Sequence, residues 1–420
     1  MTGCKNNRYE LEKILEWAIR NNVAVTREDE ADFCVINTCT VTHVADKKSR
    51  QLIRKNKTRN SKLETIVFGC AARMQKNEFK KIGEIDHLFD NLDEVIGFLD
   101  SQLPACTLKT SPALRAPSPK RRGGLSCAVP DKPFAHSRAL VQIQDGCDNF
   151  CAYCIIAAAR GRSKSRPKAE ILDEINRHVE NGYNEVILTG INIGAYGASK
   201  TTKPEESTFA ELLEEIIKKT KVPLIRLTSL GPEYFNEKLF KVLKNPRICR
   251  HIHLSIQSAS DSVLKRMRRN YDVKKLEEII KNLKKNIPGT AITADIIVGF
   301  PEETEKEFKE TYDFVKQSKL AKCHIFPYSI RANTIAAKMK QVPDNVKKER
   351  AEKLQKLSDK QRKEFLKSQT GKKAMVIWSY RSSVDGLREG ITDNYIDVHK
   401  KGDYMPKSMT EEVLRKEMMV

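Results

Sequence analysis

The sequence has no long hydrophobic run. None of its apolar stretches approaches the roughly 20 residues that a helix needs to span a bilayer, and its first ten residues, MTGCKNNRYE, lack the apolar core of a secretory signal. These absences argue against a membrane span and against export, so we predict a cytoplasmic protein. With 40% hydrophobic and 31% charged residues among 420, the chain can form a sizeable globular core spread over several domains.

Acidic residues are fewer than basic ones. The chain has 76 Lys and Arg residues against 55 Asp and Glu residues, which gives a formal net charge of +21. Such a surplus favours polyanionic partners, because each phosphate that a basic side chain neutralises releases counterions. A solvated basic surface would give the same count. No helix with a long apolar stripe supports binding to a membrane surface.

Cysteine is not scarce, but a disulfide framework is a poor explanation for it. The count of 11 is odd, the chain is long and no export signal is visible, so metal or redox chemistry is favoured. The closest spacing is Cys147-x3-Cys151-x2-Cys154, in GCDNFCAYC. Three thiolates this close can bind three irons of a [4Fe–4S] cluster and leave the fourth iron open. Structural zinc, the alternative, needs four ligands, and no nearby His or Cys completes that set.

Three further cysteines stand far apart in the sequence. They are Cys4 in TGCKNN, Cys39 in INTCTV and Cys70 in FGCAAR. Cys39 and Cys70 each follow a predicted strand, and the carboxyl ends of parallel strands meet at one edge of a sheet. Three thiolates at that edge would suit a second cluster with an open iron. The alternative is that each is a small buried apolar residue, as we assume for the cysteines outside both motifs: Cys34, Cys106, Cys127, Cys249 and Cys323.

The spacing of apolar residues predicts an α/β protein. Residues 1–103 alternate between helices and strands, which indicates an open parallel sheet covered by helices. The proline-rich segment 104–136 predicts a linker. The expected helices cover residues 9–21, 43–57, 79–82 and 92–99, and the expected strands cover 32–37 and 64–69.

Residues 137–369 predict a second α/β domain. Six βα units fall short of the eight in a closed barrel, so we expect a partial, open (βα)6 barrel with ligands at the carboxyl ends of its strands. A long charged helix over 346–368 follows, and the short β-like runs in 370–420 predict a small β-barrel. The six strands are expected at 139–144, 185–189, 224–228, 253–257, 291–298 and 323–328.

In combination, these motifs resemble the radical S-adenosylmethionine (SAM) methylthiotransferases. The CxxxCxxC triplet follows the first barrel strand, and the family's other motifs occur in order: TGCKNNRYE, NTCTVT and FGCAARMQ before it, then ARGRSKSR, TGINIGAYG, HLSIQS and IVGFPEET after it. The last segment resembles the family's RNA-binding TRAM domain. GCK-x-N together with ARGRSKSR is similar to the bacterial subgroup that modifies N6-threonylcarbamoyladenosine beside the tRNA anticodon.

The resemblance implies an enzyme that adds a methylthio group to C2 of that adenine by SAM-derived radical chemistry. It implies two [4Fe–4S] clusters and SAM as cofactors, and tRNA, an electron donor and a sulfur source as partners. Isopentenyladenosine in tRNA and an aspartate of a ribosomal protein are alternative acceptors, because sister groups act on them. A non-catalytic iron–sulfur protein that binds RNA is an alternative of another class.

The resemblance also implies roles for individual residues. Cys147, Cys151 and Cys154 would hold the cluster that cleaves SAM, and Cys4, Cys39 and Cys70 an auxiliary cluster that presents the sulfur. Ordinary packing or turn geometry is the alternative for the SAM-contact residues, and a solvated surface is the alternative for the basic ones. The SAM contacts would be Tyr153, Thr189, Gly190, Asn192 and Gly299, and the RNA contacts Arg160, Arg162, Lys164, Arg166, Arg268 and Arg269.

The sequence departs from the family pattern without losing a cluster ligand. The usual strand before the first cysteine is missing, so we expect an empty core position in the first sheet and a poorly anchored Cys4. Several departures are expected near the SAM and substrate pocket. They are Ala157 and Ala158 for Pro-Tyr, Gly231 for a glutamate, Ala259 for a glycine, and Asn333 within an altered Pro-Gly-Thr-Pro turn.

Overall fold

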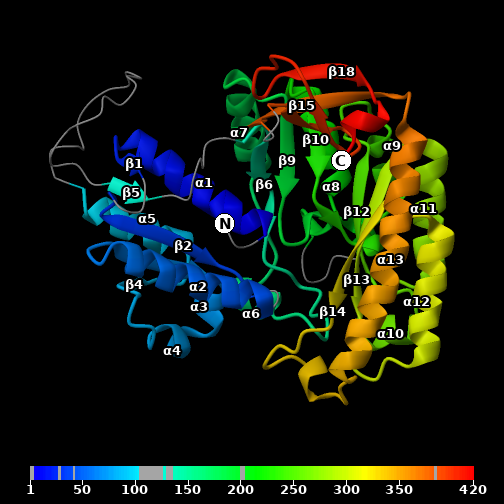
Figure 1. The fold of residues 1–420 in the computed structure, drawn as a ribbon, viewed down its shortest axis with the longest axis horizontal. Coiled ribbons are helices and arrows are strands. Elements are labelled where there is room, and N and C mark those ends of the chain that lie inside the picture. The colour runs from blue at the N-terminus through cyan, green and yellow to red at the C-terminus, as the bar shows by residue number, and fades with distance from the viewer. Residues whose placement is uncertain are drawn as a thin grey trace. The chain divides into compact units, whose positions relative to one another are not determined.

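The computed structural model describes residues 4–26, 30–40, 43–103, 126–128, 136–198, 204–382 and 386–420. The chain divides into two compact units, Met1–Phe134 with Ala158–Arg160, and Ala135–Ala157 with Gly161–Val420 (Figure 1). Most of the predicted linker, 104–125 and 129–135, lies outside the described residues. Among the described helices, none combines the length and the apolar character that crossing a bilayer requires.

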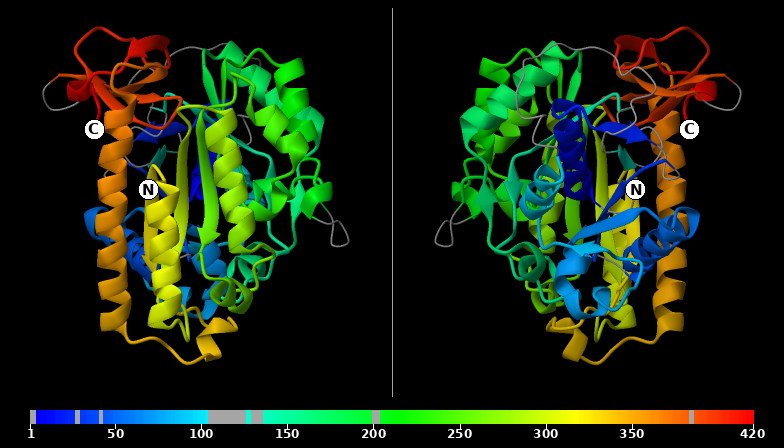
Figure 2. Two further views of the ribbon diagram at one scale, coloured as in Figure 1. Left: turned by 90° about the vertical axis from the view of Figure 1, so that its right-hand side faces the viewer. Right: turned by 90° about the vertical axis from the view of Figure 1, so that its left-hand side faces the viewer.

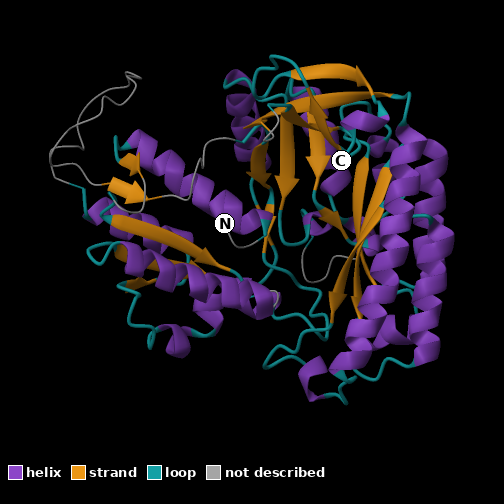
Figure 3. Cartoon of the chain, in the orientation of Figure 1, coloured by secondary structure: helices purple, strands orange, loops and turns teal. Residues whose placement is uncertain are grey.

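The N-terminal unit contains a parallel sheet with strand order β1-β5-β2-β3-β4 and helices on both faces (Figure 3). Alternate residues of β2 and β3 point to opposite faces, as the pleat of a strand requires. Ile36 and Val67 pack on one face with Phe79, and Val35 and Phe68 pack on the other. The elements are α1 (Lys5–Arg20), β1 (Ala24–Thr26), β2 (Phe33–Thr38), α2 (His43–Arg59), β3 (Glu64–Gly69), α3 (Cys70–Met74), α4 (Lys76–Phe79), β4 (His87–Leu88), α5 (Leu92–Ser101) and β5 (Ser126–Ala128).

Strand β5 corrects the expectation of an empty sheet position. It comes from within the predicted linker and lies between β1 and β2, with Cys127 paired to both Val25 and Phe33. An inner strand needs partners on both sides, because buried backbone N–H and C=O groups must be hydrogen-bonded. The sequence pattern did not predict this three-residue strand, because the prolines around it indicated a linker.

The second unit confirms the partial parallel barrel. Strands β6, β9 and β10 form one sheet, and β11 to β14 form another. The third barrel strand is split at Thr228, so that β10 pairs with β9 and β11 pairs with β12. The strands are β6 (Ala139–Gln142), β9 (Glu185–Thr189), β10 (Leu224–Leu227), β11 (Ser229–Leu230), β12 (His251–Gln257), β13 (Ala291–Val298) and β14 (Lys322–Pro327), with β7 (Gln144–Asp145) and β8 (Lys164–Ser165) in a separate pair.

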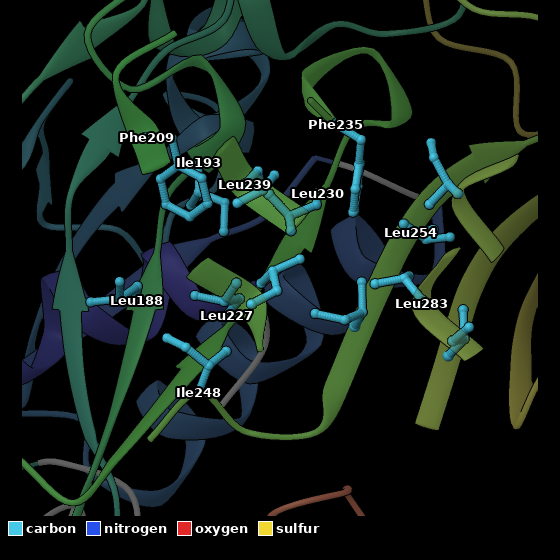
Figure 4. Packing of buried hydrophobic residues seen from close by; sticks show 14 of the residues in the cluster. Leu188, Ile193, Phe209, Leu227, Leu230, Phe235, Leu239, Ile248, Leu254 and Leu283 are labelled. Carbon is cyan, nitrogen blue, oxygen red and sulfur yellow. The ribbon is translucent and has the colours of Figure 1, made fainter. Parts of the chain in front are cut away.

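Helices cover the outside of these strands, and Figure 2 shows α13 running beside α12 over the β13–β14 side. Beneath the helices lies one continuous apolar core, in which Leu188, Leu227 and Leu254 of three strands meet Phe209 and Leu239 of two helices (Figure 4). The helices are α6 (Ile156–Arg160), α7 (Lys168–Glu180), α8 (Phe209–Lys219), α9 (Glu237–Leu243), α10 (Asp261–Arg266), α11 (Val273–Asn286), α12 (Glu305–Ser318) and α13 (Asp344–Gln369). Of these, α6 belongs largely to the N-terminal unit.

The C-terminal segment forms a four-stranded antiparallel sheet, in the order β17-β16-β15-β18. It packs on the barrel within the same unit. Arg226 of β10 pairs with Glu185 at 2.6 Å and also donates to the carbonyl oxygens of Thr392 and Asp393. Both charged side chains are fully buried, so removing either would leave the other as a buried charge without its closest ion-pair partner. The strands are β15 (Lys373–Ser382), β16 (Arg388–Thr392), β17 (Asp397–Lys400) and β18 (Met409–Val413).

Candidate functional site

The first cysteine trio lies on a loop that follows β7. Gly146 opens this loop with φ of +70°, and a Cβ there would lie 2.0 Å from the carbonyl oxygen of Arg162. Only glycine satisfies both constraints. The loop is held by hydrogen bonds from the Cys147 N–H to the Gly161 carbonyl and from the Ala152 N–H to the Met267 carbonyl. The three thiols are partly buried and none is in a disulfide: Cys147, Cys151 and Cys154.

A buried arginine touches this trio. Arg269 donates from Nη1 to the Cys151 sulfur at 3.1 Å and from Nε to the Tyr271 hydroxyl at 3.0 Å. The Glu233 carboxylate lies 3.5 Å from Arg269 Nη2 and accepts a 2.8 Å hydrogen bond from the Asn149 side chain. Burial raises the pKa of Cys154 to about 12, so without a metal its thiol stays protonated near neutral pH.

The predicted SAM-contact residues of the barrel lie at or beside the carboxyl ends of its strands. Thr189 ends β9, and a Cβ on Gly190 would lie 2.8 Å from the Gln144 carbonyl oxygen. The Asn192 side chain donates to the Tyr234 hydroxyl at 2.8 Å. Gly299 follows β13, and Lys347 fills the space that a side chain there would occupy. The remaining predicted contact, Tyr153, packs in the small apolar cluster with Ala152, Met267 and Phe300.

The second trio is assembled within the N-terminal unit from three separate segments. Cys4 caps the start of α1, Cys39 follows β2, and Cys70 begins α3 directly after β3. Cys39 and Cys70 are buried, whereas Cys4 is exposed. Burial raises the pKa of Cys70 to about 11, and the nearby Cys4 thiol adds to that rise. Cys4 and Cys70 thus lie near each other, and Cys39 follows β2, the strand that pairs with β3.

A polar network fixes the edge of this sheet. Asn7 donates to the Asn37 side chain at 2.7 Å and to the Thr38 carbonyl at 2.9 Å, and the Cys4 thiol donates to the Asn7 side chain at 3.0 Å. These bonds anchor Cys4 to the end of β2, contrary to the expectation of poor anchoring. Gly69 has φ of +102°, and a Cβ there would lie 2.2 Å from the Asn37 oxygen, so only glycine leaves room for the network.

A buried arginine touches this trio as well. Arg160 donates from Nε to the Cys70 sulfur at 3.2 Å and pairs with Glu10 at 2.9 Å. Residues Ala158–Arg160 pack within the N-terminal unit although they follow the cysteine loop in sequence, and Arg73 donates to the Ala159 carbonyl there. The guanidinium thus offsets negative charge that would gather on the thiolates.

The cysteine side chains limit the metal chemistry that either trio could support. Thiolate is the ligand type that [4Fe–4S] clusters use, and in such a cluster each thiolate binds its own iron. Zinc would need four ligands at about 2.0–2.3 Å from one centre. In the described part of the chain, no three His, Cys, Asp or Glu side chains converge as ligands of one metal ion.

The predicted RNA-contact residues divide into exposed and buried ones. Arg162, Lys164 and Arg268 are exposed, although Arg162 also lies over the Phe150 ring and pairs with Asp148 at 3.0 Å. Arg166 pairs with Glu174 at 2.6 Å. The two others, Arg160 and Arg269, have buried guanidinium groups directed at the cysteine sulfurs, in a role that the charge pattern did not predict.

The departures from the family pattern are accommodated locally. The Ala259 N–H bonds to the Thr311 hydroxyl at 3.1 Å, and Asn333 takes a left-handed φ of +66°, which asparagine tolerates. Ala157 and Ala158 lie in the short helix α6. The space beside Gly231 is filled by the carboxylate of Glu233. The sequence analysis assigned Arg160 and Arg269 to RNA and gave Glu233 no role, because the proximity of these side chains to the thiols arises only from folding.

Comparison with known proteins agrees with this geometry. Residues 141–315 match the radical SAM superfamily, and residues 1–90 match the family described as "Uncharacterized protein family UPF0004". A solved radical SAM methyltransferase, TsrM from Kitasatospora setae, superposes with a TM-score of 0.53 at 15% identity, covering 73% of this chain and 66% of that one. The fold and the cysteine loop therefore define a radical SAM enzyme, which implies SAM and a [4Fe–4S] cluster.

Two curated relatives indicate to which group of radical SAM enzymes the chain belongs. The threonylcarbamoyladenosine tRNA methylthiotransferase MtaB of Bacillus subtilis is 36% identical, over 98% of this chain and 92% of the relative. The tRNA-2-methylthio-N(6)-dimethylallyladenosine synthase of Desulforamulus reducens is 35% identical, over 84% of this chain and 77% of the relative. The chain belongs to the radical SAM methylthiotransferase family.

Proposed function

We propose that this enzyme adds a methylthio group to C2 of N6-threonylcarbamoyladenosine next to the tRNA anticodon. The observation that carries the proposal is the presence of two cysteine trios, each with a buried arginine at one sulfur, in a chain that aligns over 98% of its length with a relative named for that reaction. One trio alone would account for SAM cleavage but would leave the sulfur without a site.

Within this proposal, the loop trio Cys147, Cys151 and Cys154 holds the cluster at which SAM is cleaved, and Cys4, Cys39 and Cys70 hold an auxiliary [4Fe–4S] cluster. SAM bound at the first cluster supplies a carbon radical. The chain's own residues provide the rest: Thr189, Gly190, Asn192 and Gly299 shape the strand ends for SAM, and Tyr153 packs beside the loop.

Exposed basic residues in each of the two units support tRNA as the partner. Besides Arg162, Lys164 and Arg268, helix α2 exposes Lys47, Lys48, Arg54 and Lys55, and in the described residues none of these four pairs with an acidic side chain. Exposed cations without acidic partners are available to phosphates. An electron donor, a sulfur source and a cytoplasmic location stay predictions.

The nearest competing function is the same chemistry on dimethylallyladenosine in tRNA. The relative with that name matches 84% of this chain, against 98% for the threonylcarbamoyladenosine enzyme. The GCK-x-N and ARGRSKSR motifs also favour the threonylcarbamoyl substrate.

Mass spectrometry of tRNA nucleosides tests the proposal. In a host whose own methylthiotransferase genes are deleted, expression of this chain should produce 2-methylthio-N6-threonylcarbamoyladenosine. A variant with Cys39 and Cys70 both changed to alanine serves as the control and should produce none. Appearance of only the methylthio-dimethylallyl nucleoside would reassign the substrate, and formation of neither product would overturn the proposal.

A further inference from the structure

An aromatic ring lies exposed in the loop that carries the first cysteine trio. Phe150 stands directly before Cys151, and 48% of its surface is exposed. Aromatic residues normally bury a large apolar area on folding, so this exposure forgoes a stabilising contribution. The backbone of Phe150 is also unusual, because its φ of +45° lies in the left-handed region that a bulky residue enters only at a cost. The ring is therefore neither packed nor held by a relaxed backbone.

The two neighbours of Phe150 along the chain are fixed on buried groups. The Asn149 side chain donates to the buried Glu233 carboxylate at 2.8 Å. On the other side, the Cys151 sulfur accepts a 3.1 Å hydrogen bond from the buried guanidinium of Arg269. The left-handed residue between these two anchors carries its ring into solvent. Backbone strain of this kind gathers at functional sites, so it indicates a contact that the chain alone does not supply.

Basic side chains lie beside the ring. The Arg162 guanidinium lies over Phe150, 4.8 Å from the ring centre, and it also pairs with Asp148 at 3.0 Å. Lys164, two residues further along, is exposed. Ser163 between them accepts a 2.9 Å hydrogen bond from a buried glutamine of β7. Because successive side chains of an extended segment alternate, Arg162 and Lys164 share the outward side.

An exposed aromatic face with cations beside it suits an unpaired nucleotide of RNA. Unstacked bases pack on aromatic rings or on guanidinium planes, while basic side chains contact the phosphates. An enzyme that acts on a base also has to separate that base from its neighbours in the stack. In the proposed reaction the separated base is N6-threonylcarbamoyladenosine. A base next to it in the anticodon loop then loses a stacking partner.

We propose that Phe150 stacks on an anticodon-loop base that adjoins the modified adenosine, and that Arg162 and Lys164 bind phosphates of the same strand. The ring replaces the stacking that the neighbouring base loses when the adenosine leaves the stack. The loop that holds the SAM-cleaving cluster thus also holds the RNA. This inference rests on the proposed function, because it takes the tRNA anticodon loop as the substrate.

The first test measures the affinity of the anaerobically reconstituted full-length enzyme for a synthetic anticodon stem-loop that contains N6-threonylcarbamoyladenosine. Phe150→Leu keeps an apolar side chain and removes the aromatic face, so it should weaken binding at least about tenfold, as expected for one lost base–aromatic stack. Phe150→Tyr keeps the face and is the matched control, which should bind within about twofold of the unmodified protein. Fluorescence anisotropy at equal iron content measures all three.

Two further stem-loops, each without one of the bases that adjoin the adenosine, locate the contact. One of them should bind the unmodified protein and Phe150→Leu equally, because the stacked base is already missing. If Phe150→Leu weakened binding of all three RNAs by the same factor, Phe150 would act only on the shape of the loop, and the inference would be overturned. Full affinity of Phe150→Leu for the complete stem-loop would overturn it as well.

A fluorescent side chain at the same position gives an independent measurement. Phe150→Trp adds an exposed indole to a chain whose own tryptophans, Trp17 and Trp378, are buried. The complete stem-loop should quench the new fluorescence, whereas the stem-loop without the stacked base should not. Equal quenching by both would contradict the inference. An unmodified enzyme that binds the stem-loop but forms no methylthio nucleoside would instead overturn the proposed function.

Discussion

The two cysteine trios are built in opposite ways. Cys147, Cys151 and Cys154 share one loop, whereas Cys4, Cys39 and Cys70 come from three separate segments of the N-terminal unit. The surroundings are nevertheless alike. In each trio one sulfur accepts a hydrogen bond from a buried arginine, and each arginine has a glutamate beside it: Arg269 with Glu233, and Arg160 with Glu10.

The two trios differ in how the backbone holds the cysteines, but they share an arginine beside one sulfur. A short loop can be shaped by its own turns, while a dispersed trio depends on the register of β2 and β3. The guanidinium at each sulfur meets a need that does not depend on the scaffold, because several thiolates in a poorly solvated site repel one another unless a cation lies close. The following predictions test how independent the two sites are.

Removing either trio should have the largest effect. Changing Cys147, Cys151 and Cys154 to alanine should halve the iron content and abolish 5′-deoxyadenosine formation from SAM, because the SAM-cleaving cluster is lost. Changing Cys4, Cys39 and Cys70 should also halve the iron content but leave 5′-deoxyadenosine formation in place. Iron analysis and chromatography of the nucleoside check both. Loss of all iron in either variant would show that the sites are not independent.

Substituting the glycines beside the two trios should have the next largest effect. Gly69→Ala places a methyl group against Asn37 and demands φ of +102°, so we expect it to lower the free energy of unfolding by about 3 kcal/mol. Gly182→Ala is the matched control, because Gly182 has φ of +77° in open space and should cost only about 1 kcal/mol. Urea unfolding measures both values. Equal losses would mean that the polar network around Asn37 contributes little.

Gly146→Ala extends this test to the loop trio. Its methyl group would collide with the Arg162 carbonyl, so the loop should lose its cluster while the N-terminal trio keeps its own. Iron content close to half that of the unmodified protein, with 5′-deoxyadenosine formation lost, is the expected result. Full iron content would show that the loop can take another path.

The arginines should have a smaller and site-specific effect. Arg160→Gln removes a positive charge beside Cys70, and a reduced cluster carries more negative charge than an oxidised one. The midpoint potential of the N-terminal cluster should therefore fall by about 60 mV, a tenfold change in the one-electron equilibrium. Arg269→Gln should do the same for the loop cluster alone. Redox titrations followed by electron paramagnetic resonance, in proteins that keep only one trio, would reveal any shift at the wrong cluster.

The smallest effect is expected for the basic residues that follow the cysteine loop. Substituting an exposed one should change tRNA binding, whereas substituting one that is paired with an acidic side chain should not. Lys164→Ala should reduce the slope of log affinity for tRNA against log salt concentration by about one, as expected for one lost phosphate contact. Arg166→Lys, at a side chain paired with Glu174, should leave the slope unchanged. Filter binding over a salt series measures it, and equal slopes in all three proteins would remove Lys164 from the RNA surface.

Much of this architecture was readable from the sequence. Strands at 185–189 and 291–298 occur as predicted, because apolar runs specify them locally. Charged or very short strands were missed, among them β18 (MTEEV) and β5. For such segments, pairing with neighbouring strands decides the structure, and local composition carries little information.

The site residues show the same contrast between what the local sequence specifies and what only the fold decides. The motifs identified the six cysteines as candidate ligands, and the strand ends that carry Cys39 and Cys70 followed from the apolar pattern. Nothing local to Arg160 or Arg269 distinguishes them from their exposed neighbours Arg162 and Arg268, and only the fold buries one member of each pair. The sequence pattern also did not predict that the Glu233 carboxylate would fill the space beside Gly231.

The dispersed make-up of the N-terminal unit constrains the order in which the protein can mature. Strand β5 and the segment Ala158–Arg160 both belong to this unit, so a nascent chain that has left the ribosome only as far as α5 still lacks an inner strand and the cation beside Cys70. Iron insertion at Cys4, Cys39 and Cys70 would then wait for synthesis to pass residue 160. A fragment that ends at residue 103 is the wrong length for isolating this half of the enzyme.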